Sequence, residues 1–301
     1  MMAVLESESV PNPRIERTES DASPSWRFDG VSSGYLGQLK ELWQFRDIFP
    51  TLLIRANSLV YEKAFFGIGW LIINTLAITL PFALILTRVF NFDTGGVPPS
   101  VFALAGFSIW TLFRSSAQWM MKGLNSNKSL MKSFNIPPLL LVSAMMANGL
   151  VSFFVIALIL IGSIIYAWIT SGILPLVLGW NLLLVVPVFV LTLIFALGLS
   201  CFTSILSTIA ADTNHVLRYA MTGLMVASPV FYPVAIIEEK YRIWLYLNPM
   251  TGLVETFRWA LFKVGDLNIA YLSLSLAVAL LVLIAGTTFF LKYQRRILDF
   301  D

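Results

Sequence analysis

Residues that could catalyse a reaction are scarce in this chain. His215 is the only histidine, so no histidine-based metal cluster or Ser/His/Asp triad can form elsewhere in the chain, and Cys201 is the only cysteine, which excludes an intrachain disulfide. Residues 123–129 faintly match a phosphate-binding loop, but Asn127 stands where glycine must precede Lys128. We therefore predict no catalytic residue and no metal site, and we expect that the chain does not hydrolyse nucleotide by itself.

Polar residues inside an apolar run provide a second kind of candidate. Arg114 is the one charge well inside such a run, and Gln118, one helical turn later, shares its face. Placing an unpaired arginine at the centre of a bilayer costs about 3 kcal/mol or more. We expect Arg114 either to line a polar path or to make a structural hydrogen bond.

Glu255 and Arg258 form a third candidate, because their i, i+3 spacing lets them pair on one face of a helix. We expect this charged face to meet the outer headgroups or the exit of a pore. The opposite face is apolar and should pack on the rest of the protein, through Leu253, Val254, Phe257 and Leu261.

The elements that position these residues must lie in a membrane. Apolar residues make up 57% of the chain, charged residues 12%, and the mean hydropathy is +0.80. In soluble domains, apolar residues make up about 45–50% and charged residues about 25%. The net charge of +3 is small, and the basic residues do not form a stripe. We therefore predict no nucleic-acid partner.

A window of membrane length predicts an all-α protein with six transmembrane helices. They run over about 65–87, 101–121, 139–169, 173–209, 216–233 and 269–291. The third and fourth exceed the length needed, which predicts tilt or extension beyond the lipid. Only Thr170, Ser171 and Gly172 join them, so they should form an antiparallel hairpin.

The six predicted helices define a transmembrane domain over residues 65–291. The segments on either side of it differ from it in composition. Residues 1–34 show no apolar period and predict a disordered cytoplasmic tail. Residues 35–64 have near-helical apolar spacing, interrupted at Pro50, and predict an amphipathic helix in the inner membrane interface. A soluble helix packed on a partner is the alternative. We expect residues 292–301 to form a cytoplasmic C-terminus.

Two short segments between the fifth and sixth helices cannot cross a bilayer. Residues 236–247 and 250–262 are too short, carry charge and are separated by Asn248-Pro249. We expect a hairpin over about 236–263 that enters the membrane and returns, or lies on it.

Basic residues orient the bundle. With a cytoplasmic N-terminus, ten of them fall inside and five outside, and the positive-inside rule then places both termini in the cytoplasm. Between the second and third helices, a short helix over about 125–134 would be capped by Asn125 or Ser126 and end near Phe134. Its apolar side chains, including Leu130 and Met131, fit a groove on another protein. The alternative is a basic loop on anionic lipid.

Several stretches resemble ABC-2 type permeases, specifically the branch that exports O-antigen, teichoic acid and related lipid-linked glycans. The resemblance covers about residues 52–296 and is carried by residues 53–70, 95–113, 228–233 (Ser-Pro-Val-Phe-Tyr-Pro) and 247–261. It implies a homodimer in the bacterial cytoplasmic membrane, with a cytoplasmic ATPase dimer that binds ATP and Mg²⁺. This chain would bind no cofactor. The turn at 212–215 departs from the family pattern, so contacts at that turn are left unassigned.

The same resemblance implies roles for residues. A polyprenyl-linked glycan would pass through a channel between the two subunits, lined by Phe107, Trp110, Phe113, Arg114, Gln118, Phe231 and Tyr232. The ATPase would dock on Asn125, Ser126, Lys128, Leu130, Met131 and Phe134. An outer gate would include Pro229, Pro233, Asn248, Pro249, Glu255 and Arg258. The alternative function is an ABC-2 exporter of a drug or a small lipid.

Overall fold

The computed structural model describes part of the chain. The described residues are 45–61, 69, 72–73, 76–77, 81, 85, 94–127, 129–131, 136–210, 212–265 and 267–298. They form helices and turns, with no strand in any of these ranges. The predicted tail, the first part of the predicted interface helix and nearly all of the predicted span at 65–87 lie outside them.

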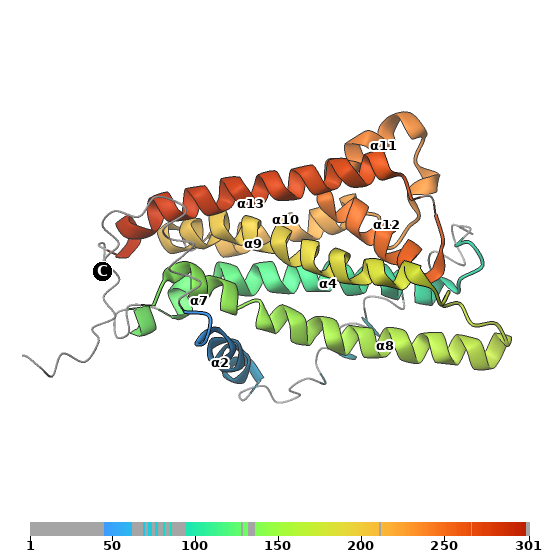
Figure 1. Ribbon diagram of the computed structural model, residues 1–301, viewed down its shortest axis with the longest axis horizontal. Coiled ribbons are helices and arrows are strands. Elements are labelled where there is room, and N and C mark those ends of the chain that lie inside the picture. The colour runs from blue at the N-terminus through green and yellow to red at the C-terminus, as the bar shows by residue number, and fades with distance from the viewer. Residues whose placement is uncertain are drawn as a thin grey trace, which may run out of the picture.

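A central helix, α4 (Pro99–Met121), organises the bundle. It packs against α8 (Ala147–Ser171) and α9 (Val185–Ile209), and α9 packs in turn along α13 (Ile269–Leu298). These helices lie side by side along the length of the molecule (Figure 1). Most of α4 is buried, including its serines at 108 and 116. Because neighbouring helices enclose α4, it tolerates polar residues that a lipid-facing helix would not.

Three helical stretches are long and apolar enough to cross a membrane. They are Pro138–Ser171, Trp180–Ile209 and Ile269–Gln294. The second predicted span corresponds to α4, which is less apolar because it carries Arg114 and Gln118. The fifth corresponds to α10 (Thr213–Ala227), which ends six residues before the predicted boundary at 233. At 15 residues, α10 is about 22 Å long, which is less than the hydrocarbon thickness of about 30 Å.

The long predicted third and fourth spans are interrupted. α7 (Pro138–Ala144) is followed by a turn at Met145 and Met146 before α8 begins. The predicted three-residue connection to the next helix is wrong. α8 ends at Ser171, and Gly172, its C-cap, has a left-handed φ of 71°. An irregular segment to Gly179 then leads into the 3-10 helix η2 (Trp180–Leu184). Pro175 helps to explain the irregular segment, because proline disfavours helix in the residue before it.

The described part of the predicted interface segment forms α2 (Phe49–Tyr61). Pro50 does not interrupt this helix as we expected, because it lies in the first turn, where a missing N–H costs nothing. Leu52 and Ala56 are buried, and α2 contacts α7 and α8. The Asn148 side chain of α8 donates to the Ala56 carbonyl at 3.3 Å, which fixes α2 on the bundle.

The segment between α10 and α13 contains no long helix. It consists of the 3-10 helix η3 (Val234–Ile236), α11 (Glu239–Tyr246) and α12 (Pro249–Phe262). α12 contacts α4, α9 and α13. The α11–α12 hairpin lies at one end of the bundle, whereas α7 and the C-terminal end of α13 lie at the other (Figure 1).

Candidate functional site

Arg258 connects α12 to the turn formed by residues 228–233. Its side chain is 1% exposed, and its guanidinium donates to the carbonyl oxygens of Pro229 at 2.6 Å, Tyr232 at 3.4 Å and Val230. Its Nε donates to the Phe102 carbonyl of α4 at 3.3 Å, and the guanidinium lies 3.7 Å from the centre of the Phe102 ring. The planar donor groups of a single arginine thus hold three segments together.

Glu255 supplies the negative charge for this buried arginine. Its Oε1 lies 3.2 Å from Arg258 Nη1, and its side chain is 16% exposed. Burial raises the pKa of the Glu255 carboxyl, although the charge and hydrogen bond of Arg258 act in the opposite direction. A buried ion pair is stabilising only when further hydrogen bonds satisfy it, and here the backbone carbonyls do so.

The start of α12 is fixed to the same turn. Asn248 is the N-cap, accepting from the Met250 N–H at 3.1 Å, while its Nδ2 donates to Ser228 Oγ at 2.7 Å. Gly106 of α4 provides the space for this junction. A Cβ built there would overlap the Val230 carbonyl oxygen and the Arg258 guanidinium. The α11–α12 hairpin is therefore joined to α4 through very close contacts.

The structure confirms the predicted pairing of Glu255 with Arg258 but not the predicted exposure of that face. Leu253, Val254 and Phe257 are buried as expected, and Arg258 is buried as well. Spacing along a helix predicts which residues share a face, but it does not predict what covers that face. Here the 228–233 turn folds over it.

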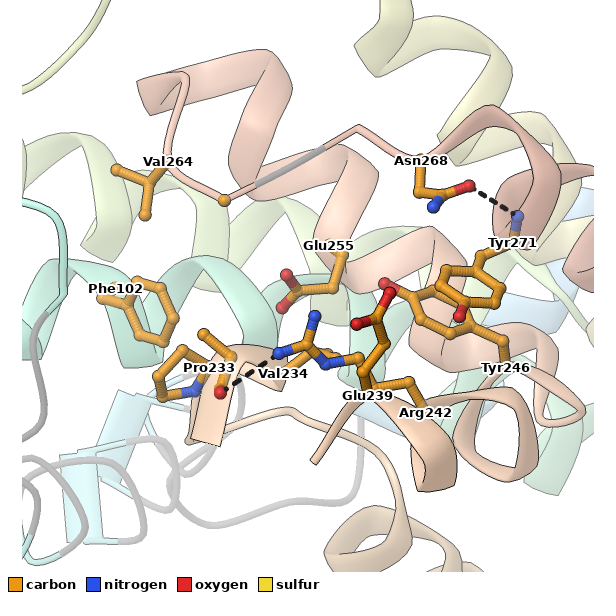
Figure 2. Close-up of a pocket in the computed structure, with 12 residues that line it drawn as sticks. Phe102, Pro233, Val234, Glu239, Arg242, Tyr246, Glu255, Val264, Asn268 and Tyr271 are labelled. Atoms are coloured by element: carbon orange, nitrogen blue, oxygen red, sulfur yellow. Dashed lines mark hydrogen bonds between the residues drawn. The ribbon is translucent and has the colours of Figure 1, made fainter. Parts of the chain in front are cut away.

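A polar pocket of about 220 Å³ opens beside this junction, between the α11–α12 hairpin and the starts of α4 and α13 (Figure 2). Glu239, Arg242 and Glu255 provide charged groups in its wall, and Asn268 provides an amide. Aromatic rings of Phe102, Tyr246 and Tyr271 also line it. Of the predicted gate residues, Pro233 and Glu255 contribute to this lining.

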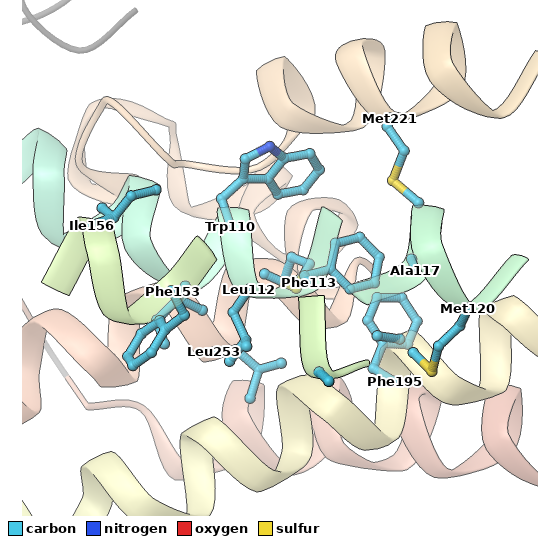
Figure 3. Packing of buried hydrophobic residues seen from close by; sticks show 14 of the residues in the cluster. Trp110, Leu112, Phe113, Ala117, Met120, Phe153, Ile156, Phe195, Met221 and Leu253 are labelled. Atoms are coloured by element: carbon cyan, nitrogen blue, oxygen red, sulfur yellow. The ribbon is translucent and has the colours of Figure 1, made fainter. Parts of the chain in front are cut away.

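The aromatic residues predicted to line a channel lie mainly inside the chain's own core. Trp110 and Phe113 are each 0% exposed (Figure 3). The Phe113 ring stacks on Phe195 at 4.8 Å, and Phe107 stacks on Phe231 at 5.8 Å. Tyr232 is half-buried, and its hydroxyl donates to the Val226 carbonyl at 3.1 Å. We expected Trp110 and Phe113 to face a channel, and their burial differs from that expectation.

Arg114 and Gln118 lie on a different side of α4. Both are half-buried, as are Thr111 and Ser115, and these four residues follow helical spacing. Ser115 Oγ lies 3.0 Å from Ser152 Oγ of α8. The central helix therefore presents one polar, incompletely covered face.

The other end of α4 leads into the segment predicted to dock an ATPase. Its short helix, α5 (Gly123–Ser126), begins two residues before the predicted 125–134 helix, and residues 129–131 are helical as well. Asn125 and Ser126 are exposed, whereas Leu130 and Met131 are 8% and 9% exposed and belong to the core. The apolar side chains that we expected on the docking face are thus packed inside the chain. Lys128 and Phe134 lie outside the described residues.

Hydrogen bonds fix this segment to the bundle. Ser207 of α9 donates from its hydroxyl to the Met121 carbonyl at 3.1 Å, and Asn125 Nδ2 donates to the Ser207 carbonyl at 3.4 Å. Asn127 Nδ2 donates to the Gly123 carbonyl at 2.9 Å. The end of α4, α5 and the end of α9 therefore form one connected unit.

Sequence reasoning missed the residues that complete the junction and the pocket. Phe102, Gly106 and Ser228 contact the Arg258 or Asn248 side chains from distant parts of the chain. Glu239 and Arg242 fall in the predicted hairpin but received no role. The available signal in the sequence was Arg258, which lies in a mostly apolar helix whose other charged residue is Glu255. A buried arginine needs several hydrogen-bond partners.

The long apolar helices are typical of a helical membrane protein. The family model described as ABC-2 type transporter matches residues 49–262, more than half of the chain. The chain belongs to the ABC-2 type transporter family.

Relatives of known description extend the comparison. The chain is 24% identical to the O-antigen export system permease protein RfbA of Myxococcus xanthus, over 85% of this chain and 96% of the relative. It is also 24% identical to the protein of the same name from Klebsiella pneumoniae, over 83% and 94% of the two chains. The polysialic acid transport protein KpsM of Escherichia coli is 23% identical over 69% of this chain and 79% of its own length.

Proposed function

We propose that this chain is the permease subunit of an ABC exporter that moves a lipid-linked polysaccharide across the cytoplasmic membrane. The observation that carries the proposal is the near full-length similarity to two O-antigen export permeases. The polysialic acid transport protein supports the same substrate class. These relatives favour a glycan over the alternative of a drug or small lipid.

The polar face of α4 suits a glycan. Sugar hydroxyls exchange hydrogen bonds readily with residues such as Thr111, Arg114 and Gln118, which are half-buried within one subunit. A second subunit placed against this face would enclose a polar path and would remove the cost of an arginine in lipid. Weak, repeated contacts let a polymer slide, whereas a deep specific site would hold it.

We propose that two copies of the chain form the transporter. α10 leaves Val216, Tyr219 and Val226 between 64% and 75% exposed, so one subunit does not cover this helix by itself. Arg218 and Thr222 on the same helix are exposed too, and such polar groups are more stable against protein than in hydrocarbon. A second copy on α10 accounts for both.

A separate ATPase dimer, with ATP and Mg²⁺ bound to it, would supply the energy. Its docking surface is the exposed side of the segment after α4, formed by Lys122, Asn125, Ser126 and Ser129. α5 contacts α7 and lies at the same end of the bundle as the C-terminal end of α13 (Figure 1). The charge asymmetry of the sequence predicts a cytoplasmic position for this end of the bundle, and the α11–α12 hairpin would then be an outer gate.

α4 can connect the two ends mechanically. Asn125 and Ser207 tie its C-terminal end to α5 and α9, and Arg258 ties Phe102 near its N-terminal end to α12. A shift of this helix would therefore reach the 228–233 turn. ATP drives the transition only if it binds one arrangement of the dimer more tightly than the other.

Deletion of the gene in its own host tests the function. The proposal predicts that a lipid-linked glycan accumulates on the inner side of the cytoplasmic membrane and disappears from the cell surface. Supplying the chain restores surface glycan, but not when its ATPase carries a substitution that blocks hydrolysis. Unchanged surface glycan together with increased sensitivity to a drug would support the alternative instead.

A further inference from the structure

The pocket beside the Arg258 junction has the chemistry of a small binding site. Its acceptors are the carboxylates of Glu239 and Glu255, and its donors include Arg242 and Asn268. Arg242 is held in position by donating from Nε to the Ile237 carbonyl at 2.9 Å and from Nη2 to the Ala235 carbonyl at 3.3 Å. Asn268 Oδ1 accepts from the Ala270 and Tyr271 N–H groups, which leaves its Nδ2 able to donate into the pocket.

Aromatic rings form the apolar part of the wall. Tyr246 and Tyr271 stack with their ring centres 4.6 Å apart and nearly parallel, and Phe102 lies on another side of the pocket (Figure 2). Stacked rings are stiff and present apolar surface with a polar hydroxyl at the edge. Wall residues come from α4, η3, α11, α12 and the start of α13, so packing between elements preforms the pocket.

We propose that this pocket binds a single sugar unit of the glycan as it leaves the transporter. Saccharides combine hydroxyl groups, which need mixed donors and acceptors, with flat C–H faces, which pack on aromatic rings. The cavity volume of about 220 Å³ suits one sugar ring. This inference rests on the proposed glycan export, because it identifies the pocket as the part of that path next to the 228–233 turn.

The charges in the pocket argue against other ligands. The carboxylates of Glu239 and Glu255 would repel a phosphate or pyrophosphate group. The nearby cation Arg258 is already paired with Glu255. A lipid chain would cover the Glu239 carboxylate, the remaining Arg242 donors and the Asn268 amide nitrogen without offering them any hydrogen bond, which is costly. A metal ion would meet the positive charge of Arg242. A neutral, hydroxyl-rich ligand satisfies all these groups.

Glu255 links occupancy of the pocket to the junction. Its Oε1 interacts with Arg258, while the carboxylate also lines the pocket. Asn268, just before α13, and Tyr271, in its first turn, also line the pocket. A sugar in the pocket would therefore bridge α13 to the hairpin segment that holds the 228–233 turn.

Saturation-transfer NMR on the full-length chain in nanodiscs tests the site, with free hexoses and N-acetylhexosamines as probes. We expect saturation transfer to at least one sugar, reduced at least several-fold by Glu239→Gln and by Tyr271→Ala. Glu238→Gln is the matched control, because the Glu238 carboxylate is exposed and pairs with Lys240 at 2.6 Å outside the pocket. It should leave the signal unchanged. Absence of transfer, or equal transfer in all four proteins, overturns the inference.

The two proposals fail in different ways. A transporter that exports a glycan in cells but shows no variant-dependent sugar signal contradicts the pocket assignment alone. A sugar signal that depends on Glu239 and Tyr271, in a protein whose deletion leaves surface glycan unchanged, contradicts the export function and keeps the binding site. Thermal unfolding of each variant shows whether a lost signal comes from lost folding.

Discussion

The guanidinium of Arg258 lies 3.2 Å from the Glu255 carboxylate one helical turn earlier, and it also donates to the Pro229 carbonyl at 2.6 Å. The first contact neutralises a buried charge within α12. The second attaches α12 to the turn that follows α10, and a further bond to the Phe102 carbonyl reaches α4. Breaking this group of contacts should release the α11–α12 hairpin from the bundle.

Replacing Arg258 tests how much this junction stabilises the protein. Arg258→Met removes one partner of a buried ion pair, which typically costs about 3–5 kcal/mol, so we expect a clear fall in Tm. Arg258→Lys should restore only part of the lost Tm, because an ammonium lacks the planar, multiple donors of a guanidinium. Lys263→Met is the control, since Lys263 is exposed just after the same helix. Thermal unfolding in detergent measures the change, and a Tm for Arg258→Lys equal to wild type contradicts the multiple-carbonyl role.

Gly106 tests the close approach of α4 to the turn. Gly106→Ala would place a Cβ against the Val230 carbonyl oxygen and the Arg258 guanidinium, and such overpacking typically costs about 1–3 kcal/mol. Gly162→Ala on α8 has no atom within 4 Å of the added Cβ and should be neutral or stabilising. Unfolding curves compare the two variants. Equal stability would show that the junction is looser than described.

The docking surface after α4 gives a third prediction. Ser126→Trp places a bulky side chain on the exposed side and should weaken assembly with the ATPase by about 2 kcal/mol or more, if the site is central to the interface. Ser171→Trp, exposed at the opposite end of α8, is the control. Co-purification of the ATPase measures assembly. Leu130→Asp is unsuitable for this purpose, because Leu130 is buried and the charge would destabilise the chain itself.

Normal co-purification of the Ser126→Trp protein, at wild-type Tm, would place the ATPase elsewhere. Loss of assembly in both tryptophan variants would indicate a general folding defect instead.

Arg114 separates a role in transport from a role in stability. It is half-buried on the polar face of α4, so Arg114→Leu should change the free energy of unfolding by no more than about 0.5 kcal/mol while export falls. Export is measured as surface glycan at equal membrane abundance. Thr288→Leu is the control, because Thr288 is exposed on α13 and lies outside both the polar face of α4 and the proposed dimer surface on α10. A parallel loss of stability and export assigns Arg114 a structural role.

The helical, membrane-embedded fold was predictable because apolar runs of membrane length have few alternatives. Breaks within those runs were harder to predict. Met145 and Met146 are ordinary helix formers, yet α7 and α8 separate there. α10 ends at Ala227 although the apolar run continues through Phe231, and the turn that follows is held by Arg258. Such endings depend on contacts far along the chain.

The candidate site was predictable only in part, for a related reason. Helical spacing correctly paired Glu255 with Arg258. It could not reveal that the turn at 228–233 buries the pair, or that Trp110 and Phe113 pack inside one subunit. Hydropathy measures how apolar a residue is, and a core, a lipid-facing surface and an aromatic channel all favour the same residues.

ATP hydrolysis by the purified complex of this chain and its ATPase tests the central claim most directly. In nanodiscs, a lipid-linked glycan from the host should stimulate hydrolysis, and the same lipid carrier without sugar should stimulate it much less. Hydrophobic drugs should have no comparable effect. Stimulation by drugs or by the bare lipid, with none by the glycan, would contradict the assignment of this chain as a glycan export permease.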